Sequence, residues 1–199
     1  MRGSVSTIAL LLGVAAIARG QTCTDAHYRW AVKTAEALAS TTPNRANITA
    51  ILTTWTIPDL TGQSQFKCAD RGGKELKSYV VLGWVRRVVT DESDGDWHVE
   101  LTSHSDTPVD SCMVVEIPPG ALGANYGQAR VDLQHRVSWS SSGNVAQPVR
   151  LRFIGAAFFD GEHRGGATRR DQTDGNHGHC NSSARALWEL HPVYWVKQP

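Results

Sequence analysis

The sequence predicts a mainly β domain that follows an N-terminal helical arm. Five short runs rich in β-branched and aromatic residues lie between residues 79 and 196. One of these runs, residues 96–103, alternates polar and apolar side chains and follows Asp94-Gly95, a pair that favours a two-residue hairpin turn. Before residue 79, the clearest periodic pattern is helical. Together these observations indicate strands in the second part of the chain and helix in the first.

Residues 1–20 have the pattern of a signal peptide. Arg2 supplies a positive charge, residues 8–18 form an apolar run, and small residues stand at Ala18 and Gly20. The run is too short to span a bilayer. We therefore expect cleavage after Gly20, a secreted protein that is extracellular or periplasmic, and no stable membrane association. A frayed apolar N-terminus and a retained N-terminal anchor are the alternatives that the sequence leaves open.

The charge of the chain excludes a general attraction to polyanions. The formal net charge is +1 over 199 residues, so binding to nucleic acid or anionic membranes needs a local basic patch. The sequence therefore leaves three kinds of partner open: a small molecule, a saccharide or a nucleic-acid ligand. The sequence does not indicate an oligomeric state.

Four cysteines are present: Cys23, Cys68, Cys112 and Cys180. An even number in an exported chain predicts two disulfides. Three pairings are possible, and the sequence favours none of them. No two cysteines have the Cys-x-x-Cys spacing that is typical of structural zinc sites.

The arm, residues 21–78, is predicted to cap a barrel domain at residues 79–199. Residues 24–40 are rich in helix formers, which predicts a helix. Residues 46–55 are ambiguous, because their apolar residues have helical spacing while their threonines favour a strand. Residues 58–73 have the composition of a loop.

The order of the elements after residue 78 predicts the topology. Strands are expected at 79–90, 96–103, 113–117, 149–159 and 186–196, with a short helix at 121–136 between the third and the fourth. This is the order of the OB-fold, a five-stranded Greek-key barrel. Gly83 and Gly155, inside the first and fourth strands, allow the bending that a barrel requires. We therefore predict a five-stranded OB-like Greek-key barrel with an N-terminal helical arm.

An ordered set of motifs resembles a family of uncharacterised secreted bacterial proteins. The motifs are a D-x-D-x-H segment at residues 94–98, an E-I-P segment at 116–118, an F-F-D strand end at 158–160 and an E-L-H-P segment at 189–192. The resemblance covers residues 79–196 and leaves the arm out. It implies an OB-like barrel and implies no activity. This chain carries extra length between residues 161 and 186.

Polar side chains alternate with apolar ones on three of the predicted strands. In the second strand, His98 and Glu100 point away from the face that Val99 and Leu101 form. The third and fifth strands follow the same alternation. The OB order makes these strands neighbours, and the outer face of an OB barrel is a common binding surface. We therefore expect five residues on one outward face to bind the ligand: His98, Glu100, Glu116, Glu189 and His191.

Imidazoles and carboxylates on adjacent strands can also hold a divalent metal ion with open positions, which makes such an ion the cofactor that the sequence allows. Its ligands would be His98, Glu116, Glu189 and His191. Two plainer interpretations stay open: solvated Glu–His pairs on the outer face of the sheet, and a structural polar network. No sequence motif marks a catalytic nucleophile, so catalytic residues are unknown.

Three further features receive structural interpretations. His177-Gly178-His179 can bind a transition metal, but the plainer interpretation of residues 161–183 is a flexible surface loop pinned by Cys180. Asp91, Asp94 and Asp96 do not match the EF-hand pattern, so they are interpreted as turn residues. Trp139 lies in a Ser-rich segment and is expected to be an exposed stacking residue.

The leading functional hypothesis is a secreted OB-like binding module with a polar ligand site on the barrel face. The alternative is an extracellular metal-dependent hydrolase of the phosphodiesterase or nuclease type, which uses a His/Glu site. The sequence decides neither the ligand nor whether a reaction occurs.

Overall fold

The computed structural model describes residues 26–58, 68–164 and 177–199. The expected signal peptide and Cys23 lie outside the described residues. In chain order, with η marking a 3₁₀ turn, the elements are α1 (Trp30–Lys33), β1 (Asn44–Ala46), α2 (Ile48–Thr54), η2 (Gly73–Leu76), β2 (Ser78–Val89), β3 (Trp97–Thr102), β4 (Met113–Ile117), η3 (Gly120–Leu122), α3 (Ala124–Gln134), β5 (Asn144–Phe159), η4 (Gly161–Arg164), η6 (Ala184–Leu187) and β6 (Trp188–Lys197).

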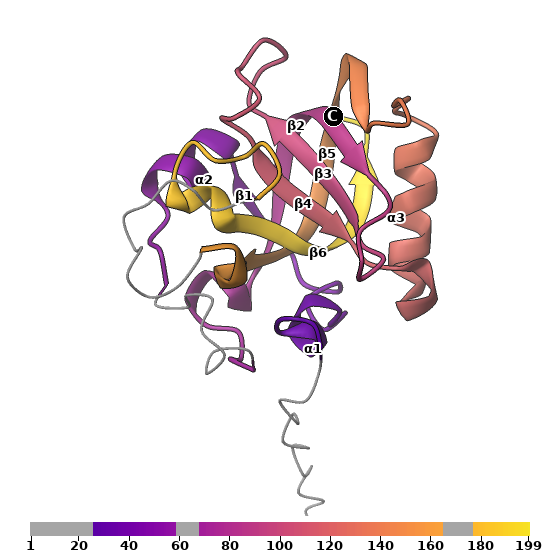
Figure 1. The fold of residues 1–199 in the computed structure, drawn as a ribbon. Coiled ribbons are helices and arrows are strands. Elements are labelled where there is room, and N and C mark those ends of the chain that lie inside the picture. Colours follow the sequence, from indigo (N-terminus) through magenta and orange to yellow (C-terminus); the bar gives the residue numbers. More distant parts are fainter. Residues whose placement is uncertain (1–25, 59–67, 165–176) are drawn as a thin grey trace, which may run out of the picture.

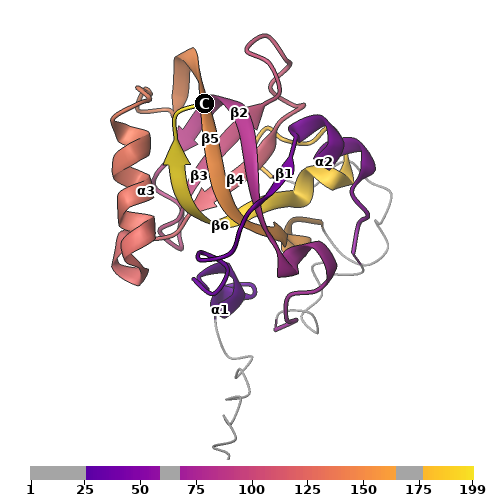
Figure 2. The ribbon, with the colours of Figure 1, turned by 180° about the vertical axis from the view of Figure 1, so that it is seen from behind.

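Five strands close into a barrel in the order β2-β3-β4-β6-β5, and β2 pairs again with β5. All the pairings around this barrel are antiparallel except β4–β6, which is parallel. Helix α3 connects β4 to β5 and lies along one side of the barrel (Figures 1 and 2). The predicted five-stranded OB-like Greek-key barrel is confirmed.

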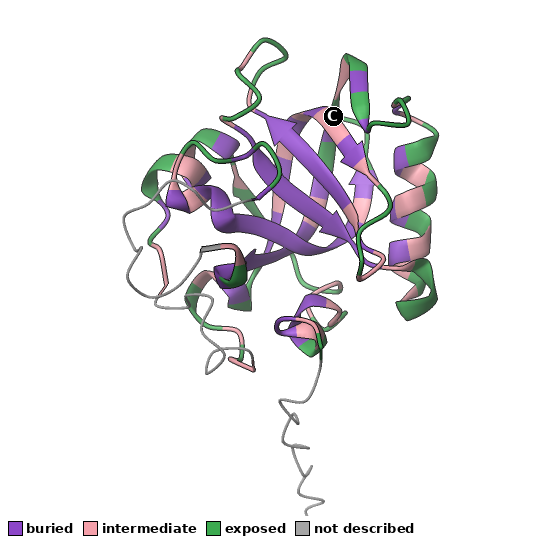
Figure 3. Cartoon of the chain, viewed as in Figure 1, coloured by how far each residue is buried: buried purple, intermediate pink, exposed green. Residues whose placement is uncertain are grey.

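The barrel interior is filled by the apolar positions of the alternating strands. Val99, Leu101, Val115 and Leu190 are all fully buried in one core cluster. Strands β4 and β6 are also buried on their opposite face, where polar residues stand (Figure 3). This second buried face is unexpected from the sequence, because an outward strand face is usually in water.

Gly155 marks a close approach of two strands. The β5–β6 register shifts on both sides of Gly155, and a Cβ at this position would lie 2.5 Å from the carbonyl oxygen of Pro192. At Gly83 the register is regular, but a Cβ would lie 2.8 Å from Cδ1 of Ile48. Glycine therefore permits a bulge at residue 155 and close packing of the arm at residue 83.

The arm is less helical than its composition predicts. Within the described part of residues 24–40, the helix is only α1, because Arg29 adopts a left-handed backbone conformation with φ 49° and the chain leaves the helix at Thr34. The ambiguous segment becomes α2, which Asn47 caps by accepting a hydrogen bond from the backbone N–H of Ala50. Ile51 of this helix is part of the barrel core. The division between arm and barrel domain stays a prediction.

Two other local features refine the sequence picture. The β2–β3 connection is a longer loop than the predicted two-residue turn, since β2 ends at Val89 and β3 begins at Trp97, and Gly95 takes the left-handed position with φ 81°. A disulfide joins Cys112 to Cys180 and ties the start of β4 to the segment before β6. Cys68 is also disulfide-bonded. Among the described helices, none has the length and hydropathy to cross a membrane.

Candidate metal site

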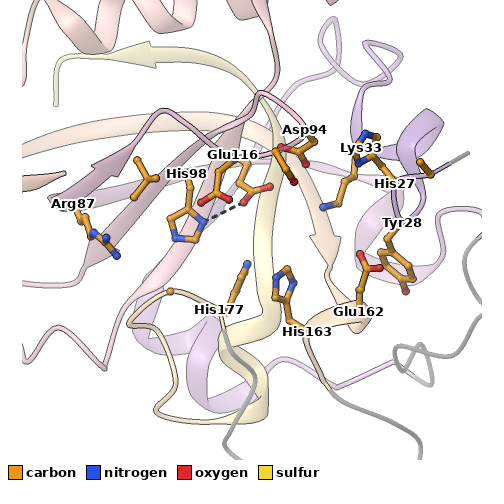
Figure 4. Close-up of a pocket in the computed structure, with 15 residues that line it drawn as sticks. His27, Tyr28, Lys33, Arg87, Asp94, His98, Glu116, Glu162, His163 and His177 are labelled. Atoms are coloured by element: carbon orange, nitrogen blue, oxygen red, sulfur yellow. Dashed lines mark hydrogen bonds and ion pairs between the residues drawn. The ribbon is translucent and has the colours of Figure 1, made fainter. Parts of the chain in front are cut away.

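A polar pocket of about 440 Å³ opens over the polar face of β3 and β4, which is the face opposite the apolar core. The arm forms one wall through Tyr28 and Lys33, and the segments that follow β5 and precede η6 form another through His163 and His177 (Figure 4). Its volume lies within the range of small-molecule sites, about 300–1,000 Å³. The side chains of His98 and Glu116 lie at its floor.

Strand pairing brings the sequence-predicted residues together. His98 on β3 is the cross-strand partner of Glu116 on β4, and His98 Nδ1 lies 3.2 Å from Glu116 Oε1. Strand β6 runs beside β4, so His191 Nδ1 lies 2.8 Å from Glu116 Oε2 and 3.1 Å from Glu189 Oε1. Glu100 lies next to His98, with Oε1 3.7 Å from His98 Nε2. All five predicted residues therefore stand in one cluster, on the face opposite the apolar core.

This face is covered, which corrects the solvent-facing expectation. Glu100, Glu189 and His191 are fully buried, and His98 and Glu116 are 5% and 7% exposed. The cover consists of the arm and the segment around His177, and neither could be placed on the barrel from strand alternation. Simple solvated pairs therefore do not describe these residues. What remains is a buried polar network or a metal site.

His177 belongs to the site and not to a solvated loop surface. It is 1% exposed, and its Nδ1 lies 3.0 Å from the carbonyl oxygen of Ala186. A carbonyl only accepts hydrogen bonds, so Nδ1 carries a hydrogen and the neutral ring has its lone pair on Nε2. That Nε2 lies 3.1 Å from Glu189 Oε2 without forming a hydrogen bond. A lone pair against a carboxylate is unfavourable unless a cation or proton lies between them.

Asp96, which is interpreted from the sequence as a turn residue, also belongs to the site. Its carboxylate is 1% exposed, and neither oxygen makes a hydrogen bond among the described residues. Oδ2 lies 3.0 Å from His191 Nε2, which is also without a hydrogen bond. Asp94, in contrast, does act as a turn residue, because it accepts the backbone N–H of Asp96.

A third group lies at the end of β5. Asp160 is buried and pairs with Lys33 of the arm, with Nζ 3.2 Å from Oδ2, and with His163, with Nδ1 3.1 Å from the same oxygen. Sequence reasoning missed Lys33, Asp160 and His163 as site residues. The F-F-D strand end in the motif set was the one available signal for Asp160, and nothing marked Lys33.

The remaining predictions on the 161–183 segment and on Trp139 are also settled in part. His179 is half exposed, and both its ring and its backbone N–H bond Glu100. Trp139 is partly buried and packs edge-on against Trp97, so it is not a free stacking platform. Residues 165–176 lie outside the described residues.

The electrostatics of the cluster favour cations. Burial lowers the pKa of His98, but the carboxylates of Glu100 and Glu116 outweigh burial and raise that pKa to about 10. Burial likewise opposes the charge of His191, but Asp96 and Glu116 raise the pKa well above its usual value. The imidazoles therefore hold protons when no metal is bound, so a metal ion competes with protons for them.

Three sets of side chains place ligand atoms within 4.8 Å of one another. They are His98–Glu116–His177, Asp160–His163–His177 and Asp96–Glu116–His191. Buried polar atoms in native proteins nearly always have hydrogen-bond partners. Several atoms of these sets make no hydrogen bond among the described residues: Asp96 Oδ1 and Oδ2, the Nε2 atoms of His98, His177 and His191, and Nδ1 of His163. The residue types suit zinc, iron or manganese.

Compared with known proteins, the chain matches no family model, no curated protein and no solved structure. The function must therefore be argued from the site.

Proposed function

We propose that this barrel binds a divalent transition-metal ion through His98, Glu116 and His177 and holds a small polar ligand on that ion. The observation that carries the proposal is that three buried side chains place ligand atoms within 4.8 Å of one another. The Nε2 atoms of both histidines make no hydrogen bond among the described residues. Two imidazoles and one carboxylate are a ligand set of zinc enzymes and of non-haem iron sites.

The second coordination layer supports the same assignment. A metal-bound histidine usually donates its other ring N–H to a carbonyl or carboxylate, which fixes the tautomer. His177 does this toward Ala186 O at 3.0 Å. The three protein ligands leave coordination positions open toward the pocket, as sites that act on ligands do.

The ligand that suits this pocket carries oxygen acceptors. Tyr28 Oη and Arg87 Nε are buried donors at the pocket wall that make no hydrogen bond among the described residues. Both are free to donate to carboxylate, phosphate or hydroxyl oxygens of a bound molecule. A polar small molecule therefore fits better than an apolar one.

Elemental analysis and calorimetric titration of the full chain with Zn²⁺ test the metal. We expect bound metal in the wild type and at least a tenfold weaker affinity in His177→Ala. The exposed His135 provides the matched control, and His135→Ala should bind as the wild type does. A wild-type protein that takes up no Zn²⁺, Mn²⁺ or Fe²⁺ contradicts the proposal.

The alternative function, hydrolysis of a phosphodiester, is favoured by one further observation. His163 lines the pocket, and although burial acts to lower its pKa, Asp160 raises it to about 9. If a metal ion were bound in the pocket, a protonated His163 would serve as a general acid for a leaving group. The test is release of nitrophenolate from bis(p-nitrophenyl) phosphate by the metal-loaded protein. If the protein is a hydrolase, it should release nitrophenolate, and His163→Gln should lower the rate at least tenfold. If the metal-loaded protein binds the ester without turnover, the binding module is the correct function.

Export is part of the proposal. The buried Cys112–Cys180 disulfide supports an oxidising compartment. N-terminal sequencing of protein recovered from a secreting host should begin at Gln21. Membership of the resembled bacterial family stays a prediction.

A further inference from the structure

The cluster Asp96–Glu116–His191 lies deeper than the pocket floor. Asp96 and His191 are 1% and 0% exposed, and neither lines the pocket. They share Glu116 with the His98–Glu116–His177 set. The metal site proposed above therefore has an enclosed neighbour built from the same carboxylate.

The enclosed cluster has the same defect in hydrogen bonding as the pocket floor. His191 Nδ1 is hydrogen-bonded to Glu189 Oε1 at 3.1 Å. Because a carboxylate accepts that bond, the neutral ring keeps its lone pair on Nε2. Nε2 faces Asp96 Oδ2 at 3.0 Å with no hydrogen bond, and Asp96 Oδ1 has no partner among the described residues either. With the ring neutral, two acceptors would face each other in a buried site, so this position takes up either a proton, when no metal is bound, or a metal ion that displaces the proton.

The separation between Asp96 and His191 is also compatible with two atoms that share a metal ion. Nitrogen and oxygen ligands lie about 2.0–2.2 Å from zinc, so two ligands about 90–110° apart are separated by about 3.0–3.5 Å. The Asp96–His191 separation, 3.0 Å, falls in this range.

The charge balance distinguishes this cluster from the one at Asp160. Asp160 has a fixed cation, Lys33 Nζ at 3.2 Å, whereas Asp96 pairs with no lysine or arginine among the described residues and only with His191. The covered face carries five buried carboxylates: Asp96, Glu100, Glu116, Asp160 and Glu189. In the described part of the chain, only Lys33 and Arg87 supply fixed positive charge in ion pairs with them. Asp96 thus has no lysine or arginine in ion-pair contact among the described residues, and Arg130 acts on it only at longer range.

We propose that Asp96, Glu116 and His191 bind a second divalent cation, and that Glu116 bridges it to the ion at the pocket floor. Glu116 lies between the two sets and belongs to both. Its Oε1 lies 3.2 Å from His98 Nδ1 and its Oε2 lies 2.8 Å from His191 Nδ1, so one oxygen is directed toward each set. Carboxylate-bridged ions in two-metal sites lie about 3.5–4 Å apart and clamp the oxygens of one substrate. The outer ion meets the ligand, and the enclosed ion holds Glu116 in place. The inference rests on the proposed function, since both ions share Glu116.

Metal stoichiometry tests this inference on the full chain, first stripped with chelator and then titrated with Zn²⁺. The wild type should bind two ions per chain and Asp96→Asn one. His177→Ala should also keep one ion, the enclosed one. Asp91→Asn, an exposed change in the same loop, is the matched control and should bind two. One ion in both the wild type and Asp96→Asn overturns the second site and leaves the proposed function intact, whereas no ion in the wild type overturns both.

A measurement on the wild type alone covers the case in which Asp96→Asn does not fold. Loading with Mn²⁺ and recording the electron paramagnetic resonance spectrum should show two spin-coupled ions. Two ions per chain with the spectrum of isolated Mn²⁺ exclude the Glu116 bridge. A single uncoupled ion per chain excludes the second site.

Discussion

A buried ion pair within the arm, whose carboxylate also bonds the barrel strand β5, should make a measurable contribution to stability. Arg29 and Glu75 are 0% and 2% exposed at their side chains and form two hydrogen bonds, of 2.7 Å and 2.9 Å. The Glu75 oxygens also accept the backbone N–H groups of Phe159 and Gly72. In Glu75→Gln, the amide NH₂ would face donors and leave the Arg29 charge without its partner.

Breaking one side of a buried pair costs about 3–5 kcal/mol. For a chain of this size, each kcal/mol lowers Tm by about 2–4 °C, so Glu75→Gln should unfold about 6–20 °C below the wild type. Circular dichroism during heating measures this shift. Asp132→Asn is the matched control, because Asp132 pairs with Arg136 at 2.8 Å but both side chains are about a quarter exposed. The control should lose no more than about 1 kcal/mol.

Equal Tm values for Glu75→Gln and Asp132→Asn would refute the reasoning that the buried pair secures the arm. Because the arm also carries Lys33 and Tyr28 to the pocket wall, the destabilised variant should bind Zn²⁺ more weakly. Unchanged Zn²⁺ affinity together with a large loss of Tm would show that the arm is not needed for the metal site.

Three other perturbations probe the site and its cover. Gly178→Ala should abolish metal binding, because the new Cβ would lie 2.5 Å from Glu100 Oε1 on a backbone with φ 61°. Gly73→Ala is the control: its φ is 54° and nothing lies within 4 Å of the new Cβ. The control should lose only the left-handed strain energy of about 1–2 kcal/mol and should keep its metal. Burial raises the pKa of Glu100, but hydrogen bonds from neighbouring imidazoles and a backbone N–H outweigh burial and lower that pKa from 4.5 to about 2. The stability that Glu100 contributes is thus complete above pH 4.5 and is lost as pH falls toward 2. In urea titrations over this pH range, the free energy of unfolding should therefore fall less for Glu100→Gln than for the wild type. The Cys112–Cys180 bridge spans 68 residues, so its replacement by two serines should cost about 4 kcal/mol in the chain-entropy model, and a Tm unchanged by the replacement would count against that.

Local sequence determined the strands and the direction of their side chains. A strand has a side-chain period of two, so the alternation around His98 and Glu116 places both opposite the core wherever the strands lie. The order of the strands with one helix between the third and fourth then made β3, β4 and β6 neighbours. Side-chain alternation and strand order together suffice to bring Glu189 and His191 to the same face as His98 and Glu116.

Only the tertiary structure decided that this face is buried and which residues complete it. Burial depends on the arm and on the segment before η6, which lie far from the strands in sequence and pack through individual contacts. Lys33 meets Asp160 across 127 positions, and no periodicity encodes such a contact. Asp96 and His177 looked like turn and loop residues because their neighbours are glycines, and their chemistry depends on the buried partners that the fold sets beside them.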